Sequence, residues 1–412
     1  MSQFHWIGDA VYSPNNSVAG LVHAYKNLTD NVEYQWFQER MDVIDGVWDD
    51  HDYGVNDGGR DVEDKGTRQG MFLDFLFGSG EGDVALRAQE GLYHSRTVAL
   101  GEGLTAKLVF LDTRSHRGPH WLYSIGAIPL PLTALIAASV RTTYTMLGFG
   151  REHDADVLGE AQWTWLERTL SDSDADFHVI ASSIQVLTTN PVVESWGHFP
   201  VARRRLLDLL RRTDPSGVVL LSGDVHHGEL SSASIVRDHH HHRHDDDDND
   251  VGAGAGARAE GNRQQALVEV TSSGLTHTCG GGRLTGLLCP AMLKQFSEHR
   301  LAPEAIFTGK NFGILQGVSP TLSGSGPAAL DVSVVDLASR TTVLQHRVFA
   351  HDSHVPREPI SAIRAHDLAV DVAFVGKVYA AAVTIGLVIL WLLWRLLGVF
   401  RKKRSGVKTK RG

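Results

Sequence analysis

Five apolar runs that each end in polar or charged residues constrain the fold of this chain most strongly. They are FHWIGD at 4–9, VIDGVWDDHD at 43–52, KLVFLDTR at 107–114, HVIASSIQ at 178–185 and GVVLLSGDVHH at 217–227. Near-continuous apolar runs are typical of strands that are buried on both faces. In an α/β sheet, the polar residues that follow such strands gather at one edge and form the functional site. The pattern therefore predicts an α/β fold with its site at the strand ends.

Further elements follow from the spacing of the apolar residues. A helical period is found in GEAQWTWLERTL at 159–170 and in PVARRRLLDLLRRT at 200–213. Later β-rich runs read ALVEVTSSG, LDVSVVDLA and TTVLQHRVFA. With 42% hydrophobic and 21% charged residues among 412, the composition is that of a globular protein with a sizeable core.

The net charge of −9 is unevenly distributed, because the residues from Arg401 onward carry +7 and the rest of the chain is strongly acidic. A nucleic-acid-binding protein would present a basic face, so this acidic body argues against nucleic acid as a partner. The oligomeric state does not follow from the composition.

The C-terminal end contains the strongest membrane signal. VYAAAVTIGLVILWLLWRLLGVF at 378–400 is long enough for a bilayer core of about 30 Å, and it lacks the polar stripe of a buried core helix. We predict a domain at 1–365, a juxtamembrane linker at 366–377, a transmembrane helix at 378–400 and a cytoplasmic tail at 401–412. The domain would then be lumenal or extracellular, although MSQFHWIGDAVY does not resemble a signal peptide. A tail-anchored protein with a cytosolic body is the alternative, and it would require seven basic residues to cross the membrane.

Two segments and two cysteines stand apart from this order. DHHHHRHDDDDND with the Gly- and Ala-rich sequence after it, at 238–265, is predicted to be a disordered insertion rather than a metal-binding tract. The apolar stretch at 121–140 contains two prolines and is predicted to be an amphipathic or buried insertion, with membrane-surface contact as the alternative. Cys279 and Cys289 are too few for a thiolate zinc site. They are two free thiols, or a small disulfide loop if the domain lies in an oxidising compartment.

GVWDDHDYGVNDGG, which begins at Gly46, concentrates four carboxylates beside one histidine. A calcium loop of the EF-hand type fits poorly, because the sixth position counted from Asp50 is valine where that loop needs glycine. A polar turn is the other ordinary interpretation. Asp9 and Asp224 follow two other predicted strands in the same way, and His226 comes shortly after Asp224. We therefore predict that Asp9, Asp50, Asp224 and His226 converge around metal.

In this arrangement the sequence resembles the alkaline phosphatase D (PhoD-like) branch of the calcineurin-like metallophosphoesterases. The resemblance lies in WIGDAVY, GVWDDHDYGVNDGG, FLDTRSHR, ASSIQVL, LSGDVHHGEL, VTSSGLTHT and KNFGIL, which together span residues 4–315. It implies two mixed β-sheets packed as a sandwich with flanking helices. The family begins with an earlier strand that supplies a ligand to the first metal, whereas this chain starts at the second strand. We expect that a preceding segment, with that strand and a signal peptide, is missing from this sequence.

The resemblance implies metal ligands at Asp9, Tyr12, Asp50, Asp224 and His226. Asp9 would bridge two ions, and Tyr12 would bind ferric iron as a phenolate. Because the donors are mostly oxygens, Fe3+ with Ca2+ or Mn2+ is favoured over zinc.

The implied activity is hydrolysis of phosphate mono- or diesters. The two metals would lower the pKa of a shared water, and the resulting hydroxide would attack phosphorus in line. His51 would protonate the leaving oxygen or bond to a non-bridging one. Arg114 would hold the phosphate, or would form a structural ion pair with Asp112 or another carboxylate. The alternative function is a non-catalytic, degenerate phosphatase-fold domain that is tethered to the membrane and binds a ligand or partner, and the substrate stays open among monoesters, diesters and phospholipids.

Overall fold

The computed structural model describes residues 2–78, 84–101, 103–122, 140–145, 147–191, 193–236, 264–279, 289–290, 293, 299–318 and 327–350. Nearly all of the predicted insertion at 238–265, most of the apolar stretch at 121–140, and the linker, transmembrane helix and tail predicted at 366–412 lie outside these residues. In the described ranges, no helix has the length and apolar character needed to cross a membrane.

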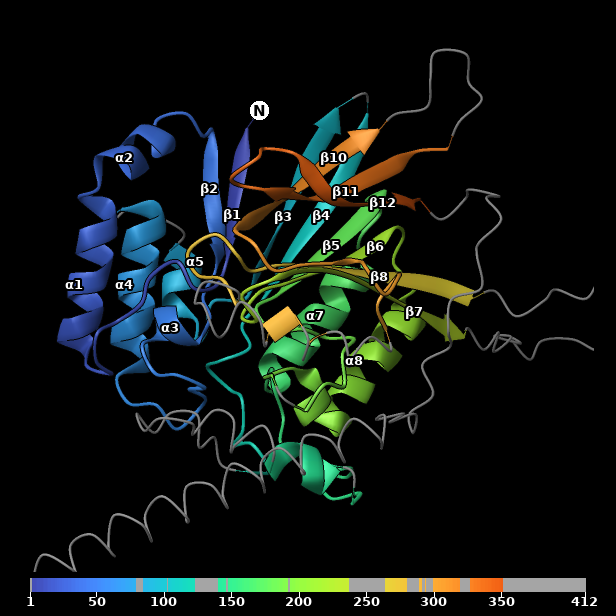
Figure 1. Cartoon of the computed structure of the whole chain (residues 1–412), viewed down its shortest axis with the longest axis horizontal. Coiled ribbons are helices and arrows are strands. Elements are labelled where there is room, and N and C mark those ends of the chain that lie inside the picture. Colours follow the sequence, from blue (N-terminus) through green and yellow to red (C-terminus); the bar gives the residue numbers. More distant parts are fainter. Residues whose placement is uncertain are drawn as a thin grey trace, which may run out of the picture.

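A seven-stranded sheet forms the centre of the fold, with the strand order β3-β4-β5-β6-β8-β7-β9 (Figure 1). Its strands are β3 His94–Gly101, β4 Leu104–Leu111, β5 Phe177–Ser182, β6 Val218–Ser222, β7 Gly228–Val236, β8 Gln264–Ser272 and β9 Ile306–Phe307. Strands β4, β5, β6 and β8 are parallel, whereas β3 and β7 run antiparallel to their neighbours, so the sheet is mixed. The strands expected near 107–114, 178–185 and 217–227 are confirmed as β4, β5 and β6, and each ends before its polar tip.

The central sheet is covered on both faces, which explains why its strands have such apolar sequences. Side chains alternate along β4, so that Ala106, Leu108 and Phe110 pack into one hydrophobic cluster while Val109 and Leu111 pack into another. The second cluster lies against α7 Glu160–Ser171 and α8 Pro200–Thr213, the two helices that the apolar spacing predicted. Pro200 occupies the first turn of α8, where its missing N–H has no cost.

The other face of the sheet packs against two smaller sheets, and a group of helices packs against the β1–β2 pair (Figure 1). β10 Asn311–Val318, β11 Ala329–Asp336 and β12 Thr342–Phe349 form an antiparallel sheet, and β1 Gln3–Ile7 and β2 Val43–Val47 form a parallel pair. The helices are α1 Val18–Thr29, α2 Val32–Gln38, α3 Asp50–Tyr53, α4 Lys65–Phe77 and α5 Val84–Ala88. The α/β class and the presence of several sheets are confirmed. The details differ from the expected pair of mixed sheets, because only the central sheet of the three is mixed.

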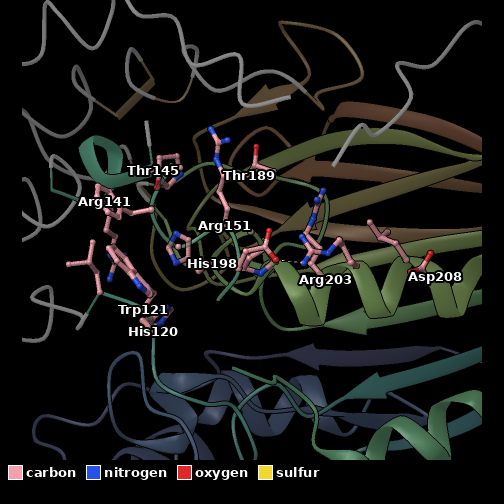
Figure 2. Close-up of a pocket in the computed structure, with 18 of the residues that line it drawn as sticks. His120, Trp121, Arg141, Thr145, Arg151, Thr189, His198, Arg203 and Asp208 are labelled. Atoms are coloured by element: carbon pink, nitrogen blue, oxygen red, sulfur yellow. Dashed lines mark hydrogen bonds and ion pairs between the residues drawn. The ribbon is translucent and has the colours of Figure 1, made fainter. Parts of the chain in front are cut away.

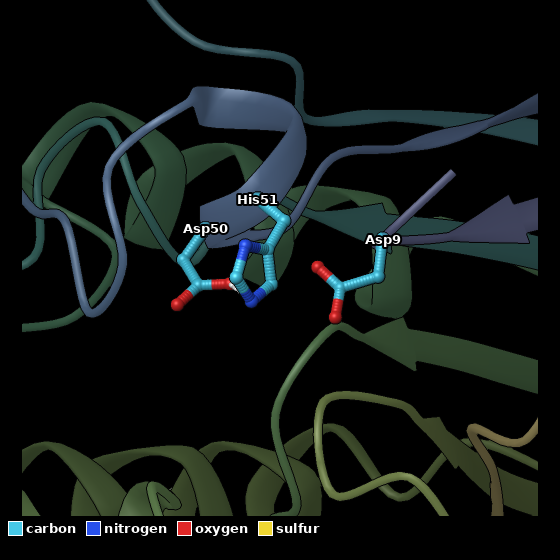
Figure 3. A group of neighbouring side chains, drawn as sticks. All are labelled: Asp9, Asp50 and His51. Carbon is cyan, nitrogen blue, oxygen red and sulfur yellow. Dashed lines mark ion pairs between the residues drawn. The ribbon is translucent and has the colours of Figure 1, made fainter. Parts of the chain in front are cut away.

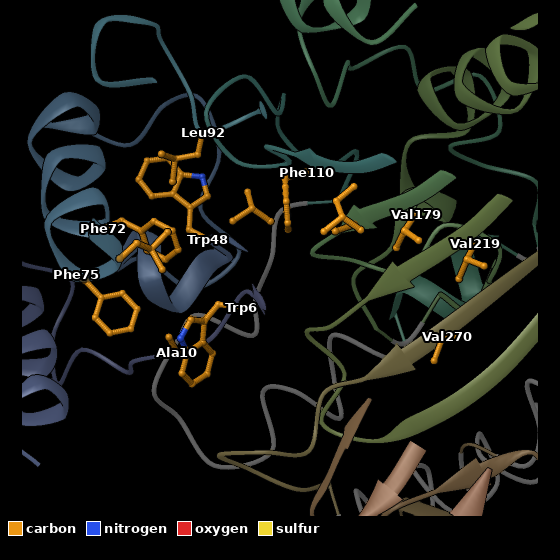
Figure 4. Close-up of a cluster of buried hydrophobic side chains, with 14 of the residues drawn as sticks. Trp6, Ala10, Trp48, Phe72, Phe75, Leu92, Phe110, Val179, Val219 and Val270 are labelled. Atoms are coloured by element: carbon orange, nitrogen blue, oxygen red, sulfur yellow. The ribbon is translucent and has the colours of Figure 1, made fainter. Parts of the chain in front are cut away.

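One continuous core joins the β1–β2 pair to the central sheet (Figure 4). Trp48 packs against Phe72 of α4 and Trp6 against Phe75, and Phe110 of β4 continues the cluster into the central sheet. Trp48 is fully buried and lies edge-on to Tyr53, with 4.9 Å between the ring centroids. This packing fixes the ends of β1 and β2 relative to β4, β5 and β6.

Candidate metal centre

Close backbone contacts bring the ends of β1, β2 and β6 together. Gly8, directly after β1, has φ +100°, and a Cβ there would lie 2.3 Å from Cβ of Asp49. Gly223, directly after β6, is packed so closely that a Cβ would lie 2.9 Å from the carbonyl oxygen of Ile7. A side chain at either position would clash with these neighbours, so both positions require glycine. These close contacts allow the residues that follow the three strands to meet in one place.

The residues that follow these glycines have strained backbones. Asp9, Asp224 and His226 all have positive φ, at 55°, 66° and 57°. This conformation is uncommon for residues other than glycine and is concentrated at functional sites, where the surrounding structure holds it in place.

Four carboxylates converge at this point, and each offers an oxygen within 4.8 Å of the others: Asp9, Asp49, Asp50 and Asp224. One oxygen on each of Asp9, Asp49 and Asp50 is buried and has no hydrogen-bond partner among the described residues. Figure 3 shows Asp50 and His51 projecting from α3 into the same region as Asp9. Buried polar atoms without partners are rare in proteins, and crowded carboxylates accept cations. This donor set therefore fits metal ions.

The pKa shifts of these carboxylates also favour a bound cation. Burial raises the pKa of Asp49, Asp50 and Asp224, and the negative charges of their neighbours raise it further. Burial also acts to raise the pKa of Asp9, but the neighbouring His226, His51 and Tyr12 together outweigh it, so that the pKa lies below its ordinary value. A cation would relieve the repulsion that these shifts reflect.

Tyr12 and His226 lie beside Asp9. The hydroxyl of Tyr12 donates to Oδ2 of Asp9 over 3.0 Å and lies 3.0 Å from Nε2 of His226. His226 Nε2 is 3.7 Å from the same oxygen of Asp9. The structure thus brings all five predicted ligands into one region, with Asp9 adjacent to both groups of donors.

His51, the predicted catalytic residue, lies at the open side of the cluster. Its Nε2 is 3.9 Å from Oδ1 of Asp50, and 27% of its side chain is exposed. Its ring centroid is 4.1 Å from that of Tyr12, and the ring of His277 packs 4.0 Å from the same phenol. Sequence reasoning missed His277, although it lies within the VTSSGLTHT motif.

Arg114 is fully buried in an ion-pair network, which matches the structural alternative left open by the sequence. Its Nε donates to Asp49, and its Nη1 donates to Oε2 of Glu194 over 2.8 Å. Asp112 instead accepts the backbone N–H of Arg114. Glu194 also accepts a hydrogen bond from His120 over 2.9 Å. Glu194 carried no signal in the sequence, because no apolar strand precedes it.

The remaining acids of the 46–59 stretch, Asp52 and Asp57, take part in hydrogen bonds that position the cluster. Asp52 is buried and accepts the backbone N–H groups of Val11 and Asp49, each over 3.1 Å. It therefore ties the segment after β1 to the segment after β2. The backbone N–H of Asp57 donates to Oδ2 of Asp50 over 2.7 Å. Asn56 is exposed.

Cys279 and Cys289 form a disulfide next to this site, so the second of the two sequence interpretations is the one found. The backbone N–H of Cys279 donates to the carbonyl of His226 over 2.9 Å. Ser273 accepts the N–H of His226 through its hydroxyl over 3.0 Å. The segment from Ser273 to Cys279 thus holds the strained turn that carries Asp224 and His226.

Comparison with known proteins agrees with the resemblance found in the sequence. Residues 86–286 match the family model "PhoD-like phosphatase", a range that includes Asp224 and His226 but not Asp9 or Asp50. Alkaline phosphatase D of Bacillus subtilis (strain 168) is 31% identical over 84 residues, a stretch that covers 18% of this chain and only 14% of that protein.

Two solved structures are similar over most of the chain. "Structure of PhoD" aligns with a TM-score of 0.45 and 16% identity, over 93% of this chain and 72% of that one. "GAP50 the anchor in the inner membrane complex of Plasmodium" aligns with a TM-score of 0.36 and 12% identity, over 92% of this chain and 93% of that one. On the family match and the curated relative, this chain is similar to the PhoD-like phosphatases over residues 86–286, just under half of its length.

Proposed function

We propose that this chain is a metal-dependent phosphoesterase that cleaves phosphate mono- or diesters at the acidic cluster. The family supports a phosphatase acting on phosphate esters. The observation that carries metal dependence is the set of four facing carboxylates, of which three have a buried oxygen with no hydrogen-bond partner in the described part of the chain. Arg114 is the buried cation bonded to this set, and it is shared with Glu194, so the charge is far from balanced.

Two ions fit the donors better than one. Asp9 with Tyr12 and His226 would make one group of donors, and the four carboxylates would make the other, so Asp9 belongs to both groups. Because most donors are oxygens, we propose Fe3+ with Ca2+ or Mn2+. Ions bound there would lower the pKa of a water and withdraw negative charge from the phosphate oxygens.

The chain's own residues supply positioning and proton transfer. His51 is half-buried at the mouth of the cluster between Asp50 and the ring of Tyr12, where an imidazole can donate a proton to the leaving oxygen. Arg114 acts as a positioning residue, because its bonds to Asp49 and Glu194 fix the direction of the Asp49 carboxylate.

The test uses the full chain and two esters, nitrophenyl phosphate and bis(nitrophenyl) phosphate. We expect iron with calcium or manganese in the purified protein, hydrolysis of at least one ester, loss of activity on chelation and recovery when the metals return. Stoichiometric metal without hydrolysis of either ester would favour the non-catalytic alternative. Hydrolysis that survives complete removal of metal would contradict the proposed mechanism.

We also propose that 378–400 anchors the domain to a membrane, with the basic residues of 401–412 on the cytoplasmic side. Expression of the chain with an epitope tag at each end provides the test. We expect the protein to resist extraction by alkaline carbonate, and in sealed vesicles we expect protease to remove the C-terminal tag and spare the N-terminal one. The reverse pattern would support the tail-anchored alternative.

A further inference from the structure

A cavity of about 390 Å³ lies next to the candidate metal centre and takes no part in the chemistry described so far (Figure 2). His120 and Trp121 line it from the segment after β4, Arg141 and Phe149 from the segment before α7, and His198 from the turn before α8. Its volume lies in the range of small-molecule sites.

Two series of residue contacts connect this cavity to the acidic cluster. Arg141 lines the cavity and pairs with Asp57 over 3.7 Å, and the backbone N–H of Asp57 donates to Asp50. His120 also lines the cavity and bonds to Glu194, which in turn bonds to Arg114. Figure 2 shows Arg141, Trp121 and His120 at one end of the cavity and Arg203 and Asp208 at the other. The end with Arg141 and His120 is therefore the end that adjoins the metal centre.

The wall of the cavity contains buried polar atoms without partners. Nδ1 of His120 and Nε2 of His198 are both buried and have no hydrogen-bond partner within the described ranges. Burial lowers the pKa of both imidazoles, so near neutral pH each is uncharged. Because Nε2 of His120 donates its proton to Glu194, Nδ1 of the neutral ring is left to accept one further hydrogen bond. Such atoms usually meet a partner, and a ligand in the cavity would supply one.

Aromatic rings form the outer wall. The rings of Trp121 and Phe149 are nearly parallel, with 12° between their planes and 6.0 Å between their centroids. Both side chains are substantially exposed, at 43% and 51%, although large aromatic residues are usually buried. Their accessible faces suit a flat aromatic ligand.

The cavity is positive although the chain as a whole is acidic. Its charged lining consists of Arg141, Arg151, Arg203 and Arg204 against Glu152 and Asp208, a formal charge of +2 when both histidines are neutral. Arg151 has no ion-pair partner among the described residues. Arg203, in contrast, already donates hydrogen bonds to the carbonyl oxygens of Val186 and Leu187. Arg151 is thus the guanidinium best placed to meet an anionic group on a ligand.

We propose that this cavity holds the organic part of the substrate and that this part is a flat aromatic group with an anionic substituent. The inference rests on the proposed phosphoesterase function, because it places the phosphate of the same molecule at the acidic cluster. The aromatic ring lies against Trp121 and Phe149, the histidines bond to its polar edge, and Arg151 pairs with its anionic substituent.

The first experiment measures binding without turnover. The probe is hydroxynaphthalene sulfonate, the fluorescent alcohol that hydrolysis of sulfonated naphthyl phosphate releases, and the full chain is titrated with it. We expect saturable binding to one site, weakened about tenfold or more by Trp121→Ala and by Arg151→Gln. The matched controls are Trp36→Ala and Arg60→Gln, which alter exposed residues outside the cavity and should leave the affinity unchanged. Absence of saturable binding, or equal affinity in all four variants, would overturn the proposal.

The second experiment measures kcat/KM for sulfonated naphthyl phosphate and for methyl phosphate. We expect Trp121→Ala and Arg151→Gln to lower the ratio of the two values about tenfold, mainly through KM, while the control variants keep the ratio of the native chain. Hydrolysis of both esters with an unchanged ratio would overturn the assignment of the cavity and leave the proposed function intact. Probe binding with the expected variant effects, but no hydrolysis of either ester, would overturn the proposed function and with it the claim that the ligand is a substrate.

Discussion

The hydroxyl of Tyr12 donates a hydrogen bond to Oδ2 of Asp9 over 3.0 Å. Burial raises the pKa of this phenol, and the nearby charge of Asp9 raises it further. In the metal-free protein Tyr12 is therefore protonated at any physiological pH. A metal held by Tyr12 as a phenolate would have to displace this proton.

Tyr12→Phe tests that relationship. The variant keeps the ring that packs between His51 and His277 and removes only the oxygen. If Tyr12 binds ferric iron, we expect the variant to lose most of its iron and the visible absorption of an iron–phenolate bond while remaining folded. Tyr93→Phe, which alters a tyrosine outside the cluster, is the control. Equal iron content and an unchanged spectrum in Tyr12→Phe would show that the phenol is not a ligand.

Replacement of single carboxylates should have opposite effects on the metal-free and metal-bound proteins. Asp50→Asn and Asp224→Asn each remove a negative charge from a buried site whose pKa values are raised by burial and by neighbouring acids. We therefore expect both variants to raise the Tm of the chelator-treated protein by a few degrees and to shrink the further rise that metal produces.

The control for these carboxylates is Asp331→Asn on β11, where the acid forms an ion pair with Arg347 at the protein surface. Such pairs contribute little to stability, so its Tm and its response to metal should match those of the native chain. Calorimetry with and without metal provides the measurement. Asp50→Asn and Asp224→Asn proteins with lower metal-free stability and an undiminished metal response would rule out a shared site.

Asp52 should matter through its two backbone hydrogen bonds. Asp52→Ala leaves the buried N–H groups of Val11 and Asp49 without this acceptor, and each loss costs about 1–3 kcal/mol. Because these bonds join the segment after β1 to the segment after β2, metal affinity should fall about 10–100-fold as well. Asp52→Asn can still accept one of the two hydrogen bonds, so its stability and metal affinity should lie between those of the native chain and the alanine variant. Chemical unfolding and metal titration provide the measurements, and identical values for the alanine and asparagine variants would contradict this role.

The sequence predicted the strand ends well for a physical reason. Strands of the central sheet are buried on both faces and need apolar residues throughout, so the polar residues after β6 mark a strand end, where Asp224 meets Asp9 and Asp50 from the ends of the separate β1–β2 pair. The prediction was less complete for Asp49, which was not among the predicted ligands. Its carboxylate joins the cluster because Arg114 and the start of α3 direct it there, and neither effect can be seen in the order of residues.

Other features depended on tertiary contacts alone. Glu194 reaches the site from an irregular segment that follows no apolar run, and His277 lies in the irregular segment beyond the end of β8. Strand β7 was not predicted, because its buried positions include Ser231, Ser232 and Ser234, whose polar side chains hide the usual apolar pattern. The cavity beside the metal centre likewise depends on how three separate segments pack.

The last prediction concerns His299, a histidine outside the metal centre that has a depressed pKa. Burial, with the charge of Arg203 in second place, lowers the pKa of His299 from 6.5 to about 4. Its Nδ1 is buried and has no hydrogen-bond partner among the described residues, while its backbone carbonyl accepts the N–H of Ser232 on β7. The folded protein therefore holds this imidazole neutral.

The sign of the pH effect follows from linkage. A group whose folded pKa is depressed stabilises the fold above its unfolded pKa, and this contribution is lost as the pH falls from 6.5 toward the folded value of about 4. The loss attributable to His299 is at most about 3 kcal/mol. His120 and His198 act in the same direction, whereas buried carboxylates with raised pKa values act in the opposite one, so the pH dependence of the native chain is a sum of both. Only the difference between the native chain and a variant isolates His299.

His299→Gln, measured by chemical unfolding in chelator between pH 7 and pH 4, provides that difference. Glutamine cannot take up a proton in this range, so the variant should lose less stability on acidification than the native chain. The gap between the two curves should change by about 1–3 kcal/mol across the interval. His23→Gln, in the exposed face of α1, should follow the native curve throughout. A constant gap between the His299→Gln and native curves would mean that His299 takes up its proton equally well in the folded and unfolded chains, and the acid sensitivity would then have to come from other groups.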